Sequence, residues 1–237
     1  MRLSDSRAEA RFRAELAGWL DENHPAADRA SDVPRSPGHI PVWAGEWQRR
    51  LFDAGWLVPR WPPELGGRDA TAVEQMLYLE ELSRRRVPRT VNPQGLDVCA
   101  PTLADHGVGI QRDQWLLATA RGETSWCVAV EEAEVGDAAE GTDRSDAEPG
   151  RPAPGITIAE AGGALTLRGT VPAPPGAADA DRCLCGVHVE SAGARLDGVA
   201  VVAVDLRADG ITRPDDANPQ LTFDGVALTP RWAPDGS

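Results

Sequence analysis

The sequence contains no lysine, because all 24 of its basic side chains are arginines. This absence excludes catalysis through a lysine Schiff base, and it excludes a P-loop, whose lysine binds nucleotide phosphates. The 37 acidic side chains outnumber the basic ones, the formal charge is -13, and the longest basic run is the arginine triplet at 84–86. Because a protein that binds a phosphate backbone needs a basic patch, we expect no nucleic-acid partner.

Long apolar runs and paired cysteine motifs are also missing. No stretch approaches the roughly 20 apolar residues of a membrane span, and the opening MRLSDSRAEARFRAEL is charged, unlike a signal peptide. We therefore expect a cytoplasmic protein that does not associate with membranes. The four cysteines at 99, 127, 183 and 185 form no CxxC pairs, and the histidines are scattered, which predicts buried thiols and no metal site.

The first half of the chain has the apolar spacing of helices. Ser6 with Glu9, and Thr71 with Glu74, each form a capping box, in which side chains bond the free N–H groups at a helix start. The arginines at 84–86 favour the negative end of a helix dipole and predict a helix end there, with an anion site as the alternative. Helices are predicted over about 8–23, 43–54, 72–86, 95–106 and 110–121, with an ordered loop over 56–67.

Beyond Gly122 the pattern changes to short runs rich in valine, leucine and threonine. These runs predict antiparallel β structure at 124–130, 155–159, 163–169, 182–190, 198–206 and 220–230. Helices followed by strands indicate an α+β protein with two domains, 1–122 and 123–237. The segment 131–155 carries eight acidic residues and two arginines around a single large aliphatic residue, which predicts a mobile surface loop.

Long ordered patterns, rather than single short motifs, run through 12–25, 47–84 and 92–127. The last combines a helix with Pro-Thr-Leu, a His-Gly turn, and a helix that ends in Arg-Gly-Glu before the first strand. Together with GVAVVAVDLRADGI and LTFDGVALTP downstream, these stretches resemble the N-terminal helical and middle β domains of the acyl-CoA dehydrogenase family. The resemblance implies an all-helical N-terminal domain followed by an antiparallel, β-barrel-like middle domain.

The resemblance also implies a reaction. In this family, FAD accepts a hydrogen pair from Cα and Cβ of an acyl-CoA thioester, and a glutamate abstracts the α proton. The active site lies between the helical and β domains, and a third, C-terminal helical domain supplies that glutamate. The sequence ends at Ser237, where the third domain would start, so the resemblance assigns no catalytic role to any residue of this chain.

The first flavin motif of the family is a strand and a turn that hold the flavin ring and the pyrophosphate. The resemblance places residual flavin contacts at Trp126, Cys127, Val128 and Gly136. It also places Glu131 at the first hydroxyl position and Asp137 at the phosphate-binding serine position. Like charges at about 4 Å oppose each other by roughly 1 kcal/mol even in water, so two carboxylates here would weaken FAD binding.

The second flavin motif is Trp-Thr/Ser-Ser followed by Gly-Ala. Its tryptophan packs against the isoalloxazine ring, and its hydroxyl bonds near the reactive nitrogen. Aligned through the Gly-Ala at 176–177, these three positions are Ala173, Pro174 and Pro175. The ring and the hydroxyls are absent, and proline has no N–H to donate. The resemblance therefore implies that this chain alone binds FAD weakly or not at all.

Three functional hypotheses remain open from the sequence. The first is a truncated, non-catalytic partner subunit of a hetero-oligomeric acyl-CoA dehydrogenase, as in some actinobacterial members that degrade steroid side chains. The second is a competent FAD-dependent half whose C-terminal domain is a separate chain. The third is a non-catalytic remnant that binds acyl-CoA or a protein. Because the family covers these two domains with a third, we expect a dehydrogenase-like partner chain or self-association.

Overall fold

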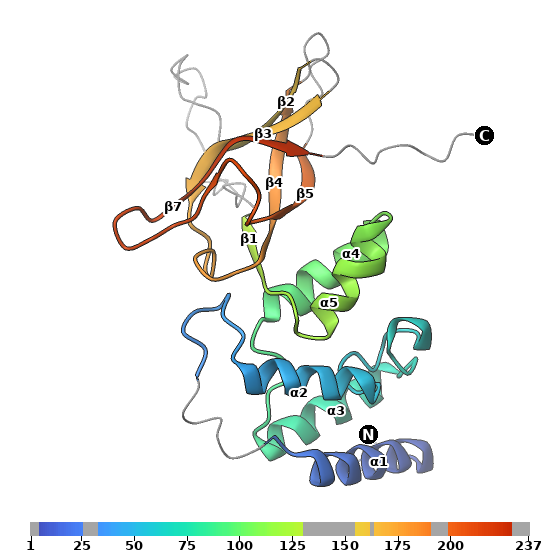
Figure 1. Cartoon of the computed structure of the whole chain (residues 1–237). Coiled ribbons are helices and arrows are strands. Elements are labelled where there is room, and N and C mark those ends of the chain that lie inside the picture. Colours follow the sequence, from blue (N-terminus) through green and yellow to red (C-terminus); the bar gives the residue numbers. More distant parts are fainter. Residues whose placement is uncertain (1–4, 26–32, 130–154, 162–163, 191–198, 229–237) are drawn as a thin grey trace, which may run out of the picture. The chain divides into compact units, whose positions relative to one another are not determined.

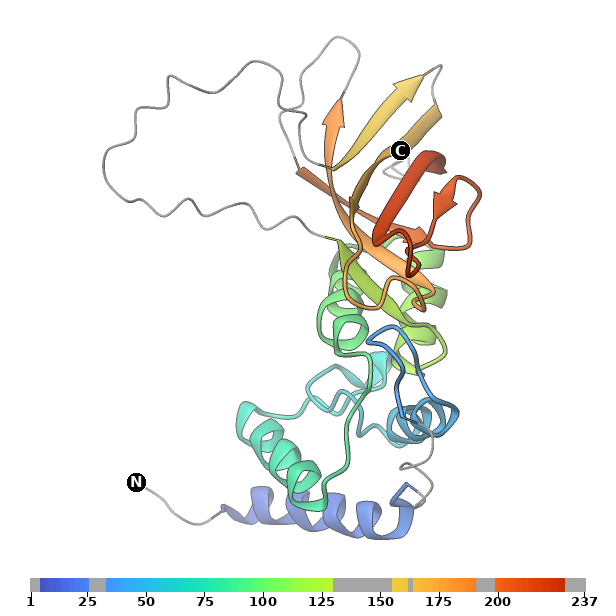
Figure 2. The same ribbon diagram turned by 90° about the vertical axis from the view of Figure 1, so that its left-hand side faces the viewer.

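A computed structural model describes residues 5–25, 33–129, 155–161, 164–190 and 199–228 of the chain. The chain divides into two compact units, Met1–Ser125 and Trp126–Ser237, called the helical unit and the sheet unit below. Figures 1 and 2 show helices in the first unit and strands in the second. The α+β fold class predicted from the sequence is confirmed.

The helices of the helical unit begin and end close to the predicted positions. Ser6 Oγ accepts a hydrogen bond from Glu9 N at 3.3 Å, and Thr71 Oγ1 accepts one from Glu74 N at 3.2 Å, so both predicted capping boxes are present. The described helical segments are α1 (Arg7–Asn23), α2 (Val42–Asp53), η2 (Pro63–Leu65), α3 (Ala72–Arg85), η3 (Gly95–Cys99), α4 (Ala100–His106), η4 (Gln111–Trp115) and α5 (Leu116–Ala120).

The two helices with the weakest sequence signal each start with a π-helical turn. The N–H of Ala100 donates to Gly95 O, and the N–H of Leu116 donates to Gln111 O, so each bond spans one residue more than in an α-helix. The extra residue shifts the apolar spacing out of the 3.6-residue period. This shift explains why the sequence predicts helices there only weakly.

Helix α3 packs against α1 through a buried carboxylate. Glu81 is 2% exposed and accepts hydrogen bonds from Arg13 Nη1 at 2.8 Å, from Arg84 Nη1 at 2.9 Å and from Arg85 Nη1. Figures 1 and 2 both show the two helices side by side. Arg86 ends α3 in a left-handed conformation, with φ of 54°. The arginine triplet thus serves the end of the helix and its packing, in agreement with the first interpretation of the sequence.

The sheet unit contains a strand at each predicted run. Its described strands are β1 (Trp126–Ala129), β2 (Ile156–Ala161), β3 (Ala164–Pro172), β4 (Arg182–Glu190), β5 (Val199–Asp205), β6 (Ile211–Thr212) and β7 (Gln220–Leu228). They form one sheet in the order β1-β4-β2-β3-β7-β6, with β5 paired to β4. Buried side chains from most of these strands form its core, among them Leu167, Leu221 and Phe223.

The pairing differs in one respect from the antiparallel arrangement expected. Among the described strands, β4 pairs in parallel with both β1 and β2, whereas the other four pairings are antiparallel. Parallel neighbours need long connections, and more than 50 residues separate β1 from β4 along the chain. The order of the described strands does not close into a barrel. The sheet is therefore mixed and open, within the predicted α+β class.

Strand β4 is the centre of this arrangement. Both β1 and β5 pair with residues 182–185 of β4, so they lie on opposite edges of it. Strand β2 then follows β1 on the same edge, at His188–Glu190. The start of β4 consequently lies beside the start of β1, where the sequence places the first flavin motif.

Candidate flavin site

The first predicted flavin strand is β1, and its side chains are turned into the protein. Trp126 and Cys127 are both 0% exposed, and Val128 is half-buried. In the parallel ladder, Trp126 lies opposite Arg182 and Cys127 lies opposite Cys183. The remaining predicted positions of this motif, Glu131, Gly136 and Asp137, lie outside the described residues.

Three thiols, those of Cys127, Cys183 and Cys185, lie together in the core of the sheet unit. Cys127 Sγ donates to Arg182 O at 3.6 Å, and the Sγ atoms of Cys183 and Cys185 are 3.4 Å apart. Hydrogen bonding with the Cys183 thiol, followed by burial, raises the pKa of Cys127 far above its ordinary value. A protonated, enclosed thiol is a poor nucleophile, which agrees with a packing role for Cys127. All four cysteines are buried and free, as the sequence predicted.

The second predicted flavin motif is a tight loop between β3 and β4. The N–H of Ala173 donates to Pro219 O at 2.9 Å, and the N–H of Ala177 donates to Pro174 O at 3.0 Å. Pro174 and Pro175 have no N–H. Ala173 packs against the core of the sheet unit, and Pro175 is exposed. Residues 173–175 therefore present no unengaged backbone donor, no aromatic ring and no hydroxyl.

Arg213 bonds to this loop, although no motif in the sequence points to it. Its Nη2 donates to Ala177 O at 3.4 Å and also to Ala180 O. The charge of Arg213 also slightly opposes the rise in the pKa of Cys127 that hydrogen bonding with Cys183 and burial cause. These contacts join segments more than 30 residues apart, and nothing around a single arginine marks such a partner in advance.

The two predicted motifs converge in the sheet unit. The loop leads directly into β4 at Arg182, and Arg182 is the register partner of Trp126. The structure thus places the start of the first predicted motif beside the strand that follows the second predicted motif. The flavin does not fit the loop itself, because an isoalloxazine needs a stacking surface and hydrogen-bond donors, and 173–175 present neither.

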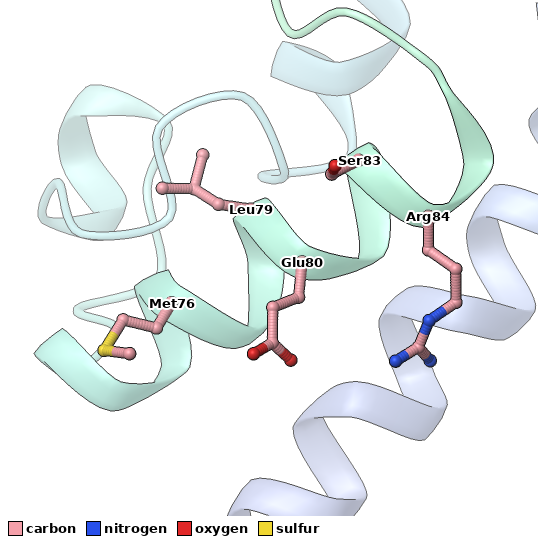
Figure 3. Close-up of a pocket in the computed structure, with 5 residues that line it drawn as sticks. All are labelled: Met76, Leu79, Glu80, Ser83 and Arg84. Carbon is pink, nitrogen blue, oxygen red and sulfur yellow. The ribbon is translucent and has the colours of Figure 1, made fainter.

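The helical unit has a shallow depression on the outer face of α3. Met76, Leu79, Glu80, Ser83 and Arg84 line it (Figure 3). Its two charged members are engaged nearby, since Arg13 Nη2 lies 2.9 Å from Glu80 Oε2 and Arg84 Nη1 lies 2.9 Å from Glu81 Oε1. This face therefore resembles a solvated helix surface and contains no group arranged for catalysis.

The described residues contain no group of three or more histidine, cysteine, aspartate or glutamate side chains placed to hold a metal ion. None of their helices has the length and apolar character needed to cross a membrane.

The helical unit matches a known family model. Residues 6–123 match the model of the acyl-CoA dehydrogenase N-terminal domain. The chain is 33% identical over 114 residues to the acyl-CoA dehydrogenase FadE34 of Mycobacterium tuberculosis. That match covers 48% of this chain and 14% of the relative.

Solved structures extend the likeness to the fold of both units. A chain in the crystal structure of the ChsE4–ChsE5 complex from Mycobacterium tuberculosis has a TM-score of 0.65 and 20% identity, with 96% of this chain and 56% of that chain covered. A chain in the structure named Tcur3481–Tcur3483 steroid ACAD has a TM-score of 0.64 and 22% identity, with 96% and 57% covered.

This chain therefore spans little more than half the length of the solved chains it matches, and a smaller part of the curated relative. The order of helices and strands, the family model and the likeness to the solved structures agree. The chain is a member of the acyl-CoA dehydrogenase family and corresponds to the N-terminal part of such proteins.

Proposed function

We propose that this chain is a non-catalytic partner subunit of a hetero-oligomeric acyl-CoA dehydrogenase. The observation that carries the proposal is the loop at 173–175, where the family has a tryptophan and two hydroxyl residues. Here Ala173 donates its N–H within the chain, and Pro174 and Pro175 have none to donate. A chain with such a loop keeps the family's scaffold but lacks the contacts that fix the flavin ring.

The magnitude of the loss supports this assignment. Truncating a buried tryptophan to alanine typically removes about 3 kcal/mol or more of packing energy. Since each 1.4 kcal/mol is a tenfold change, the missing ring alone corresponds to about a hundredfold weaker flavin binding. At the positions that the resemblance assigns to them, the carboxylates of Glu131 and Asp137 would lie beside the anionic FAD and weaken its binding further.

The partner we propose is a second acyl-CoA dehydrogenase-like chain that carries FAD and the catalytic glutamate. Two of the solved structures with this fold bear two-component names, and one of them is named a steroid ACAD. The substrate class that follows is a bulky acyl-CoA thioester bound by the partner. In this arrangement the residues of the present chain transfer no proton and no hydride, and its role is to support the fold and assembly of the partner.

Expression with and without a partner tests this proposal. Purified alone, the chain should show no stoichiometric flavin absorbance. Co-expressed with a family member that carries intact flavin motifs and a glutamate base, it should copurify as a yellow, active complex. Stoichiometric FAD on the chain alone would contradict the proposal. Flavin that appears only with a separate C-terminal helical chain would instead support the competent-half hypothesis.

A loop variant isolates the observation on which the proposal depends. Replacing Ala173→Trp, Pro174→Thr and Pro175→Ser together restores the family's residues at the second motif. We expect this variant to gain measurable FAD affinity by titration, whereas Pro214→Thr, outside the motif, should not. If the restored loop binds no more FAD than the natural one, the loop is not what limits flavin binding.

A further inference from the structure

Strand β5 forms an edge of the sheet. All seven of its residues pair with β4, from Val199 opposite His188 to Asp205 opposite Arg182. Within the described residues, no strand pairs with its other side. Figure 1 shows β5 beside β4 at the margin of the sheet. One side of β5 therefore carries backbone N–H and C=O groups that no described strand satisfies.

The sequence of β5 lacks the features that normally protect such an edge. Residues 199–204 read Val-Ala-Val-Val-Ala-Val, without a charge or a proline before Asp205. Natural sheets usually protect an open edge with lysine, proline, a bulge or a very short strand. A seven-residue edge strand whose first six residues are apolar is suited to pair with another strand.

Side chains on both faces of β5 are only partly covered by the described residues. Val204 is 4% exposed, but Ala200 and Val202, which point to the same face, are only partly buried against the core. On the opposite face Val201 is 55% exposed. A further strand beside β5 would cover Val202 from the side and extend the core of the sheet unit.

We propose that β5 pairs antiparallel with β5 of a second copy of this chain, about a twofold axis perpendicular to the sheet at Val202. In this register Val202 lies opposite its own copy. Val201 lies opposite Ala203 of the second copy, and Ala200 lies opposite its Val204. Each alanine thus faces a valine, and the same faces of the two sheets coincide.

The charged residue of β5 does not oppose this register, and the length of the paired strands sets how strong the dimer is. Asp205 lies opposite the position of Val199 in the second copy, so no like charges are opposed. Seven residues extend only about 23 Å, which is less than a standard interface provides. The dimer should therefore be weak and dependent on concentration. This inference does not rest on the proposed function.

The oligomeric state of the full chain tests whether β5 forms an interface between two copies. Sedimentation equilibrium should show a monomer–dimer equilibrium. Val201→Lys should weaken the dimer about tenfold or more, because it places an ammonium on the paired edge. The matched control, Val108→Lys, changes a valine of similar exposure (48%) in the helical unit and should leave the equilibrium unchanged. A chain that stays monomeric, or a dimer insensitive to Val201→Lys, would overturn the proposal.

Cross-linking tests the register. Directly opposed residues have Cα atoms about 5 Å apart, whereas Val201 and its own copy would be about 8 Å apart. A disulfide needs Cα atoms within about 7 Å. Mild oxidation should therefore link Val202→Cys into a covalent dimer and leave Val201→Cys unlinked. The reverse result would overturn this register, and a dimer linked by neither variant would place the contact elsewhere.

Discussion

The two units of this chain differ in the interactions that hold them together and in their match to the family model. The helical unit contains a buried carboxylate, Glu81, with three arginine partners, and it is the part that the family model matches. The sheet unit depends on strand ladders around an apolar core that includes three thiols. The solved structures share its fold, and its loop at 173–175, the predicted position of the second flavin motif, consists of alanine and proline.

The comparison teaches that a scaffold and a binding surface can change independently. Packing restricts the buried positions of both units, because a core tolerates little change in volume. The loop at 173–175 follows the last ladder pair of β3 with β7, Pro172 opposite Gln220, and Pro175 in it is exposed. Residues outside the ladder, such as Pro175, are therefore under weaker packing constraint than the core of the sheet unit.

The largest effect that can distinguish the two units is a cavity in either core. Leu51 in the helical unit and Leu167 in the sheet unit are both 0% exposed. We expect Leu51→Ala and Leu167→Ala each to cost about 2–5 kcal/mol of unfolding free energy, measured by urea denaturation. Hydrogen exchange should accelerate mainly in the helices for the first variant and mainly in the strands for the second.

Each variant is the control for the other. If the units are separate cooperative bodies, faster exchange stays within the altered unit. Uniform acceleration over the whole chain by either substitution would show that the units unfold together. That outcome would contradict the division into two separately stable units, since stability could no longer be assigned to each unit.

The fold could be predicted from the sequence wherever the signal is local. The capping boxes at Ser6 and Thr71 and the short runs of valine, leucine and threonine depend on neighbouring residues, and the structure confirms the helices and strands that they predict. The parallel pairing of β1 with β4 could not be predicted, since it depends on a connection of more than 50 residues. The π-helical turns were also missed, because they disturb the spacing from which helices are predicted.

The candidate site could be predicted only in part, for a similar reason. The resemblance assigns flavin motifs to the segments that form β1 and the loop before β4, and sequence order is enough to define both segments. Arg213 was missed because its contacts with Ala177 and Ala180 are long-range. The engagement of the Ala173 N–H by Pro219 likewise appears only in three dimensions.

The charge network of the helical unit should respond unequally to two neighbouring substitutions. Glu81 is 2% exposed, whereas the Glu80 side chain is 53% exposed. Glu81→Gln removes one carboxylate partner from Arg13 and from Arg85, and we expect it to lower the free energy of unfolding by about 2 kcal/mol. The loss is no larger because each arginine keeps another acidic neighbour. Glu80→Gln should cost less than about 1 kcal/mol. Equal losses in denaturation would mean that Glu81 is no more important than a surface pair.

The same network should make the helical unit sensitive to acid. Burial alone would raise the pKa of Glu81, but hydrogen bonds from Arg13 and Arg85 outweigh it and lower the pKa below its ordinary value of 4.5. The stabilisation is therefore complete above the unfolded pKa and is lost as pH falls through the folded pKa. The stability difference between the natural chain and Glu81→Gln should shrink below about pH 4.5, as measured by urea denaturation at several pH values. A constant difference down to pH 3 would contradict this.

The smallest effect on stability, but the finest test of the comparison, is the reactivity of the thiols. Cys99 reports on the helical unit, whereas Cys127, Cys183 and Cys185 report on the sheet unit, and all four are buried. The raised pKa values of Cys127 and Cys183 keep these thiols protonated, so iodoacetamide should not label them in the folded chain.

Labelling followed by mass spectrometry should then depend on which unit opens. Leu167→Ala should speed the modification of the three sheet thiols and spare Cys99, and Leu51→Ala should do the opposite. If Cys127 instead reacts rapidly in the folded natural chain, its thiol is neither enclosed nor protonated. In that case the strand that would hold the flavin has a reactive group, and the sheet unit is more than a scaffold.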